Sequence, residues 1–243
     1  MVIDHAAVGL IEQSELASGV AWSLCGTAMR LMGRVAFPLF AFMIAEGAVH
    51  TRDRRRYALR LLLLAVISEI PFDLVAGGTW LFPADQNTVF TLLLGLLAVW
   101  AGDLICGTGP GVSYGTREKT GDGGRKAVGQ RRFPLEYERY IRVLAAVPFG
   151  LAAYCLKTDY GFMGVLLIVI LYTLRTEPQL RTAVCAVFLF CMYMDFYGAA
   201  ACVAIFLINR YNGEKGGGNG RIFYLFYPLH LLVIRGIKMA VGL

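Results

Sequence analysis

The sequence predicts an all-α, polytopic integral membrane protein with about nine transmembrane helices. Of its 243 residues, 57% are hydrophobic and only 16% are charged, and the mean hydropathy is +0.60, values typical of a membrane protein rather than a soluble domain. Apolar runs recur along the chain, and roughly 20 apolar residues suffice for a helix to span hydrocarbon. Lysine and arginine gather in alternate linkers between these runs, a pattern that orients membrane helices.

The apolar runs place the predicted helices in order along the chain. Helices are expected at 1–13, 29–49, 57–75, 87–105, 139–156, 160–175, 181–197, 198–210 and 221–241. The first, sixth and eighth runs are short for a full crossing, so each predicts a half-helix, a tilted helix or a boundary that lies elsewhere. Residues 107–138 are predicted to form a flexible cytoplasmic linker, because 107–130 are rich in glycine and polar residues. A second flexible turn is expected at 213–220.

Positive charge separates the linkers into two groups. Basic residues follow the second, fourth, sixth and eighth helices: Arg52, Arg54, Arg55 and Arg56, then Arg117, Lys119, Arg125, Lys126, Arg131 and Arg132, then Arg175 and Arg181, then Arg210, Lys215 and Arg221. The stretches 11–28, 76–90 and 195–198 have neither lysine nor arginine, and 157–160 has only Lys157. Because basic residues accumulate in short cytoplasmic loops, we expect a multi-pass protein of a bacterial inner membrane with its N-terminus inside and its C-terminus outside.

The composition also limits what else the chain could be. No stretch remains for a separate water-soluble core, so residues 1–243 are interpreted as a single transmembrane domain. The opening residues lack the basic region of a cleavable signal peptide, so the helices themselves are expected to direct insertion. The net charge of +6 comes largely from the cytoplasmic linkers, and no nucleic-acid partner is needed to explain it. The six scattered cysteines are expected to be small buried hydrophobic residues.

Seven ionisable residues lie inside or at the ends of the apolar runs. Placing an aspartate or an arginine near the centre of a membrane helix costs about 2.5–3.5 kcal/mol or more. Such side chains must therefore face one another or a wet cavity, which makes them candidates for a functional site. They are Asp4, His5, Arg34, Glu46, Glu69, Asp73 and His230.

Polar residues of the third and fourth helices are predicted to meet near the outer leaflet. Glu69 and Asp73 are four residues apart and share one face of the third helix. Two carboxylates so placed repel each other unless a cation lies between them or one stays protonated. Gln86 and Asn87 begin the fourth helix at the same level of the membrane. We therefore expect a polar cluster in the outer half of the bundle.

Histidines in apolar helices point to chemistry. His5 and His230 are two of only three histidines in the chain. A neutral imidazole can accept a proton from a hydroxyl or amine nucleophile and later return it. Arg34 is expected to pair with Asp4 or Asp73, and the alternative that such a pair only fixes helix packing stays open. Without a pair of ligands at helical spacing, no metal site is expected.

Five short strings of residues are familiar from one protein family. They are Ile-Asp-His at 3–5, Gly-Arg-Val-Ala-Phe-Pro at 33–38, Glu-Gly at 46–47, Ser-Glu-Ile-Pro-Phe-Asp at 68–73 and Gln-Asn-Thr-Val-Phe-Thr-Leu at 86–92. These strings resemble the TraX family, which includes an inner-membrane protein associated with acetylation of conjugative pilin. The match covers most of the chain outside the cytoplasmic linker. The segment 224–230 also resembles the last helices of the wider membrane acyltransferases.

The resemblance implies an acyltransferase that moves an acetyl group from acetyl-CoA to an amine or hydroxyl at the outer side of the membrane. The acceptor implied is a pilin-like peptide, a glycan or a lipid. Its catalytic residues would be His5, Asp4 and Arg34, with His5 as general base or as a covalent acyl carrier. Six other residues would support the site or bind substrate: Glu69, Asp73, Gln86, Asn87, Tyr227 and His230. Among them, Asp73 or Glu69 would hold Arg34 in place. Four arginines are candidates for the phosphates of the donor: Arg52, Arg54, Arg55 and Arg56.

Two other functions remain open on the sequence. A small transporter or permease could use buried carboxylates to couple protons or bind a cationic solute, although no internal repeat is visible. A non-catalytic assembly factor for pili or exported proteins would need no histidine. One departure from the family pattern is that only three residues precede the Asp-His motif at 4–5, whereas the resemblance implies a longer apolar stretch there. We therefore expect either a misassigned start or a shortened first helix.

Overall fold

The computed structural model describes residues 1–12, 19–108, 133–194, 196–214 and 220–241, and every regular element among them is a helix. The all-α fold predicted from the sequence is confirmed. The helices are α1 (Val2–Ala6), the π-helical turn η1 (Ala7–Glu12), α2 (Val20–Arg34), α3 (Ala36–His50), α4 (Arg54–Ala76), α5 (Thr88–Cys106), α6 (Leu135–Cys155), α7 (Gly161–Thr173), α8 (Pro178–Tyr193), α9 (Phe196–Asn209) and α10 (Gly220–Val241).

The helices have the length and composition of a protein that crosses a membrane several times. Val20–His50, Thr88–Cys106 and Tyr224–Val241 are each long and apolar enough to span a bilayer, and Gly161–Thr173, Pro178–Tyr193 and Tyr197–Asn209 are shorter apolar helices. The chain is therefore a polytopic membrane protein. That nine segments cross the bilayer stays a prediction.

Two predicted boundaries are wrong. The stretch 11–28 was expected to be a linker, but α2 begins at Val20 and continues almost straight into α3. Helix α2 is amphipathic, with Arg30 and Arg34 on one face and exposed Leu24 and Met32 on another. The polar residues interrupt the apolar run, so a search for apolar runs did not detect the start of this helix. Helix α6 begins at Leu135, inside the predicted linker. Most of that linker and of the turn at 213–220 lies outside the described residues.

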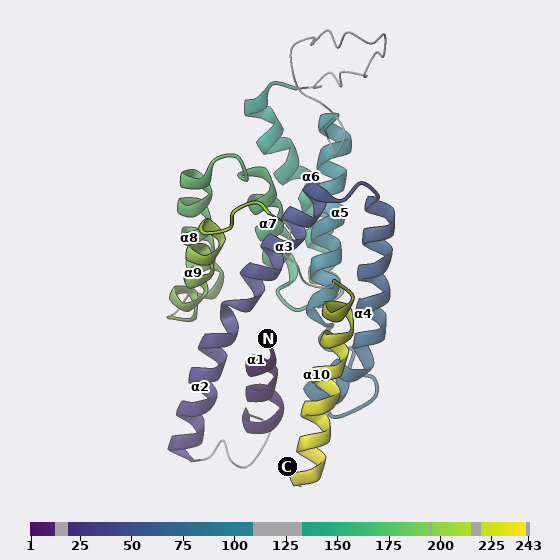
Figure 1. Ribbon diagram of the computed structural model, residues 1–243, viewed down its shortest axis with the longest axis vertical. Helices are drawn as coiled ribbons and strands as arrows, with labels where there is room; N and C mark the ends of the chain where they lie inside the picture. Colours follow the sequence, from purple (N-terminus) through teal and green to yellow (C-terminus); the bar gives the residue numbers. More distant parts are fainter. Residues whose placement is uncertain (13–18, 109–132, 195, 215–219, 242–243) are drawn as a thin grey trace.

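The core lies where α3, α5 and α7 pack together, with α4 and α6 alongside. Its fully buried side chains include Phe37, Leu96, Leu167, Ile168 and Leu171. Helices α1, α2 and α10 meet at the opposite end of the molecule from the end of α5 and the start of α6, with α1 between the other two (Figure 1). The short α1 thus lies close to α10, α2 and the lower part of α4, which is where polar side chains converge.

An ion-pair network joins four helices at the end of the bundle where α5 ends and α6 begins. Asp103 of α5 accepts from Arg142 of α6 and lies 2.6 Å from Arg54 of α4 and 2.6 Å from the Tyr172 hydroxyl of α7. Asp103, Arg54 and Arg142 are at most 7% exposed. Since a buried charge is stable only with partners, this network fixes how the four helices pack.

Replacing Asp103 with asparagine should destabilise the protein strongly. The Asp103→Asn variant keeps the size of the side chain but leaves the buried Arg54 guanidinium without its counter-charge and Arg142 with only Glu138, at 4.0 Å, which should cost about 3–5 kcal/mol. Unfolding of the purified protein in detergent measures this. The matched control Asp53→Asn removes an exposed carboxylate that pairs with Arg56 and should cost less than about 1 kcal/mol. Equal stability of the two variants would contradict a structural role for the network.

Candidate functional site

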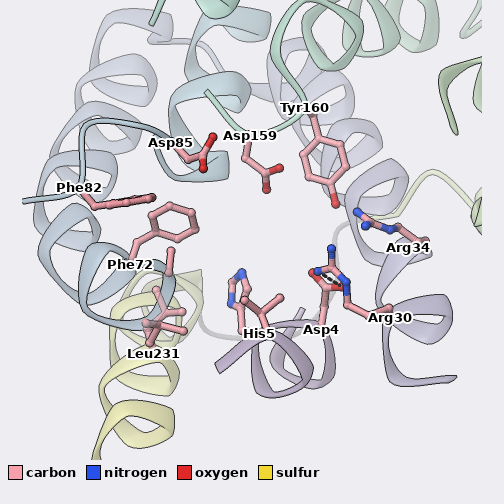
Figure 2. Close-up of a pocket in the computed structure, with 13 residues that line it drawn as sticks. Asp4, His5, Arg30, Arg34, Phe72, Phe82, Asp85, Asp159, Tyr160 and Leu231 are labelled. Atoms are coloured by element: carbon pink, nitrogen blue, oxygen red, sulfur yellow. Dashed lines mark hydrogen bonds and ion pairs between the residues drawn. The ribbon is translucent and has the colours of Figure 1, made fainter. Parts of the chain in front are cut away.

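A cavity of about 400 Å³ opens among α1, α2, α4 and α10 and the turns that precede α5 and α7. Figure 2 shows charged side chains on opposite walls and two phenylalanines on a third. The lining residues are Asp4, His5, Val8, Arg30, Arg34, Phe72, Val75, Ala76, Phe82, Asp85, Asp159, Tyr160 and Leu231. Three catalytic candidates from the sequence, Asp4, His5 and Arg34, therefore line one cavity.

His5, which lines the cavity, stacks on His230 behind it. His5 Nδ1 lies 2.8 Å from His230 Nε2, and the two rings are nearly parallel, with centroids 5.1 Å apart. His230 Nδ1 lies 2.9 Å from the carbonyl oxygen of Phe226. The edge of the Tyr227 ring also faces His5, at 6.1 Å between centroids. The two histidines that the sequence analysis selected from the first and last helices are thus in contact.

The hydrogen bonds fix which nitrogen of His5 is free. A carbonyl oxygen only accepts, so His230 Nδ1 must carry a proton and, in the neutral ring, His230 Nε2 must accept. His5 Nδ1 then donates to His230, which leaves the lone pair on His5 Nε2. The His5 ring points into the cavity (Figure 2). The arrangement therefore presents a neutral imidazole that can accept a proton from a bound molecule.

Asp4 pairs with an arginine that the sequence analysis missed. Asp4 Oδ1 lies 2.9 Å from Arg30 Nη1, whereas Arg34 was the expected partner. A Cβ at Gly33 would lie 2.4 Å from Asp4 Cβ, so α1 packs directly on the bare backbone of α2 at this glycine. Arg30 and Arg34 are four residues apart and share one face of α2. This spacing was the signal that could have identified Arg30.

Arg34 lies among aromatic rings rather than carboxylates. Its guanidinium carbon lies 5.3 Å from the ring centroid of Tyr193 and 5.5 Å from that of Tyr197, distances at which a cation is attracted to a ring face. The Tyr160 hydroxyl points toward Arg34 (Figure 2). The Tyr160 ring stacks on Phe37, with centroids 3.7 Å apart. Three residues of the segment 33–38 therefore contribute to the site. Gly33 lets α1 pack on α2, Arg34 lines the cavity and Phe37 stacks on Tyr160.

An acidic wall faces the histidines, and sequence reasoning missed this part of the site as well. Asp159 Oδ2 accepts from the Thr88 hydroxyl at 2.6 Å, and Asp85 lies next to it in Figure 2. Burial raises the pKa of Asp159, and the bond from Thr88 opposes that shift. Positive φ angles at Lys157 and Tyr160 build the tight turn that presents Asp159. A backbone conformation of this kind leaves no pattern in hydropathy.

The carboxylates of α4 do not hold Arg34, contrary to the prediction. Asp73 Oδ2 accepts from the backbone N–H of Phe82 at 3.0 Å. Glu69 Oε2 accepts from the backbone N–H of Asn87 at 3.2 Å and from its side-chain amide. Both carboxylates face the loop 77–87, because the backbone N–H groups of that loop need acceptors.

Gln86 and Asn87 were expected to support the site or bind substrate, and the structure shows both in contacts with the backbone around the cavity. Gln86 pairs through its backbone with the turn before α7, its N–H donating to Lys157 O at 3.0 Å and its carbonyl accepting from Asp159 N at 2.9 Å. Asn87 is fully buried and caps α5 by accepting from Val89 N. These two residues, with Glu69 and Asp73, hold the walls of the cavity in place.

Of the four arginines expected to bind the phosphates of the donor, the structure gives Arg54 a different, structural role. Arg54 is buried in the ion-pair network of Asp103, and Arg56 pairs with Asp53 at 3.0 Å. Arg52, Arg55 and Arg56 are exposed there. Glu46, another candidate, lies near the same end and is 3.4 Å from His50. The cluster is about 27 Å along α4 from Phe72 of the cavity.

Comparison with known proteins places the chain in a family. The sequence profile described as TraX protein matches residues 1–105 and 134–238, which is most of the chain. The chain belongs to the TraX family. The matched residues include the histidine pair, the Asp4–Arg30 pair and Arg34 of the cavity. The TraX resemblance drawn from the strings at 3–5, 33–38 and 68–73 is thus confirmed.

A curated relative is known for this TraX protein. It is named "Probable fimbrial assembly protein FimC, serogroup H1" from Dichelobacter nodosus, and it is 24% identical over 98% of this chain and 91% of its own length. No solved structure matches the chain. Among the described residues, no group of three or more His, Cys, Asp or Glu side chains is arranged to hold a metal ion.

An alanine at Gly33 should destabilise the protein, although alanine normally favours a helix. The added Cβ would overlap Asp4 and force α1 away from α2, at a cost of about 1–3 kcal/mol. The matched control is Gly236→Ala in α10, where the added Cβ meets nothing within 4 Å and should stabilise by up to about 1 kcal/mol. Unfolding in detergent compares the two variants. A Gly33→Ala variant as stable as the control would refute the close contact between α1 and α2.

Proposed function

We propose that this TraX protein is a membrane acyltransferase, with His5 as its general base. The observation that carries the proposal is the chain of hydrogen bonds from the Phe226 carbonyl through His230 to His5, because it keeps His5 Nε2 unprotonated toward the cavity. An imidazole must be neutral to accept a proton, and general-base catalysis contributes typically 10²–10⁴-fold to a rate. The membership in a family associated with pilin acetylation supports the same reaction.

The reaction transfers an acyl group between two substrates. An amine or hydroxyl of the acceptor loses its proton to His5 Nε2 and attacks the carbonyl carbon of an acyl thioester. The tetrahedral intermediate then expels the thiolate, which takes the proton from His5, so that the products are the acylated acceptor and a free thiol. A direct acyl-histidine intermediate is the alternative route, in which Nε2 itself attacks the thioester.

Arg34 is the proposed stabiliser of the oxyanion that forms during this transfer. Its side chain lines the cavity, and its Nε–H is buried without a hydrogen-bond partner among the described residues. A donor that is fixed in position and free to bind negative charge has the character of an oxyanion-hole group. The rings of Tyr193 and Tyr197 support the guanidinium without neutralising it. Asp4 acts as a positioning residue through Arg30.

We propose acetyl-CoA as the donor, on the basis of the family alone. The acceptor proposed is a pilus-related peptide, because a curated relative is named a fimbrial assembly protein. A glycan or lipid hydroxyl would fit the same chemistry. A transporter is less well supported, because the histidine pair has a fixed hydrogen-bond order and lies on one wall of a cavity at one end of the bundle.

The proposed location is the bacterial inner membrane, with the cavity toward the outer side. The basic turns lie together in the structure: Arg54 contacts Asp103, Arg139 contacts Glu177, and Arg181 lies 3.1 Å from Asn209. The turns without arginine, at 77–87 and 156–160, are joined to each other at the cavity. Basic residues mark the cytoplasmic side, so the cavity end is proposed to face outward. Met1 is only four residues before His5 of the cavity, so α1 is proposed to begin within the bundle and not at the cytoplasmic surface, where the sequence had placed the N-terminus.

Loss of the His5 imidazole should abolish acyl transfer while leaving the protein folded. With radiolabelled acetyl-CoA and a candidate acceptor, His5→Ala should lower the rate by about 10²–10⁴-fold. His230→Gln should lower it less and change its dependence on pH, since the hydrogen bond to His5 changes. The matched control is His50→Ala, which removes an exposed histidine at the far end of the bundle. Equal rates for His5→Ala and His50→Ala would falsify the enzyme proposal, and solute uptake into proteoliposomes would then favour a permease.

The topology can be tested by labelling single cysteines in intact cells. In a background without the six native cysteines, Thr79→Cys and Lys157→Cys should react with a membrane-impermeant reagent. Arg55→Cys and Glu177→Cys should react only after the membrane is opened. The reverse pattern would place the cavity on the cytoplasmic side.

A further inference from the structure

The seam between α4 and α10 has an apolar groove on the outside of the bundle, away from the cavity. The groove has a volume of about 340 Å³ and is lined by Arg60, Leu63, Leu64, Ile67, Tyr224, Leu225 and Pro228. Its rims are open, since Leu63, Ile67 and Leu225 are each more than half exposed. In a protein that crosses a membrane, side chains exposed in this way face lipid.

A positive charge stands at one end of this groove. Arg60 is exposed, and no carboxylate of the described residues lies within ion-pair distance of it. Its guanidinium carbon lies 5.8 Å from the Tyr57 ring. Arg60 is six residues beyond Arg54, or about 9 Å further along α4. From this depth an arginine can extend its head group toward the membrane interface, where lipid phosphates lie.

The two features together match one ligand. A cation at the interface attracts an anionic head group, and a groove that runs from it along the helices accepts an acyl chain. We propose that the α4–α10 seam binds one anionic phospholipid, with its phosphate against Arg60 and an acyl chain against Ile67, Leu225 and Pro228. This proposal does not rest on the acyl-transfer activity, because no residue lines both the groove and the cavity.

The lipid would also brace the helix that carries His230. Pro228 lines the groove and interrupts the hydrogen bonding of α10, because proline has no backbone N–H. His230 follows two residues later on the side of the cavity. A chain packed against Pro228 would therefore restrict the bend of α10 at the level of the histidine pair.

Lipid retention by the full-length protein tests the proposal. Native mass spectrometry would compare binding of phosphatidylglycerol and phosphatidylcholine with identical acyl chains. Wild type should prefer phosphatidylglycerol, and Arg60→Gln should weaken that binding about fivefold, while Arg60→Lys should keep most of it. The matched control is Arg210→Gln, which removes another exposed arginine that lies over an aromatic ring, Phe206, on α9. It should leave the preference unchanged.

The apolar part of the site has its own test. Ile67→Trp should fill the groove and weaken the binding of both lipids without changing the charge. Glycerol phosphate, which has the anionic group but no acyl chain, should not compete. The proposal is overturned if Arg60→Gln and Arg210→Gln have equal effects, if Ile67→Trp has none, or if glycerol phosphate displaces the lipid.

Discussion

Charged groups among apolar helices must find partners inside the protein, and this constraint shapes both ends of the bundle. An unpaired charge in hydrocarbon costs several kcal/mol, so the chain gathers its ionisable side chains into two separate clusters. At one end Asp103 is surrounded by Arg54, Arg142 and Tyr172, and the cluster is fully enclosed. At the other end Asp4 and Arg30 neutralise each other beside a cavity. The first cluster holds helices together, while the second leaves groups exposed to a bound molecule.

The cavity owes its shape to residues that do not enter it. Glu69, Asp73 and Asn87 fix the loop 77–87, and the backbone of Gln86 joins that loop to the turn at 156–160. As a result Phe82, Asp159 and Tyr160 lie opposite the histidines. Sites that bind reacting groups need such support, because a displacement of about 1 Å can cost two orders of magnitude in rate.

Much of the fold could be predicted from the sequence, because hydropathy reports directly on helices that face lipid. Eight of the predicted runs, including 57–75 and 87–105, correspond closely to observed helices. The start of α2 was missed because its polar face lowers the local hydropathy. The histidine pair and Arg34 were found because ionisable side chains are rare in such helices. Arg30, Asp159 and Tyr160 were missed because their roles depend on a helix boundary and on a turn, which only the folded chain defines.

The long helix formed by α2 and α3 gives the bilayer itself an influence on the cavity. Val20–His50 has 31 residues and so is about 46 Å long, whereas the hydrocarbon layer is about 30 Å thick. A helix longer than the hydrocarbon layer is accommodated by tilting, by kinking or by local thickening of the membrane, and each of these depends on the thickness of the surrounding membrane. Arg30 and Arg34 are fixed to its middle, so lipids with shorter or longer tails would rotate both guanidinium groups relative to α1. The length of the lipid tails would thereby influence the geometry of the cavity.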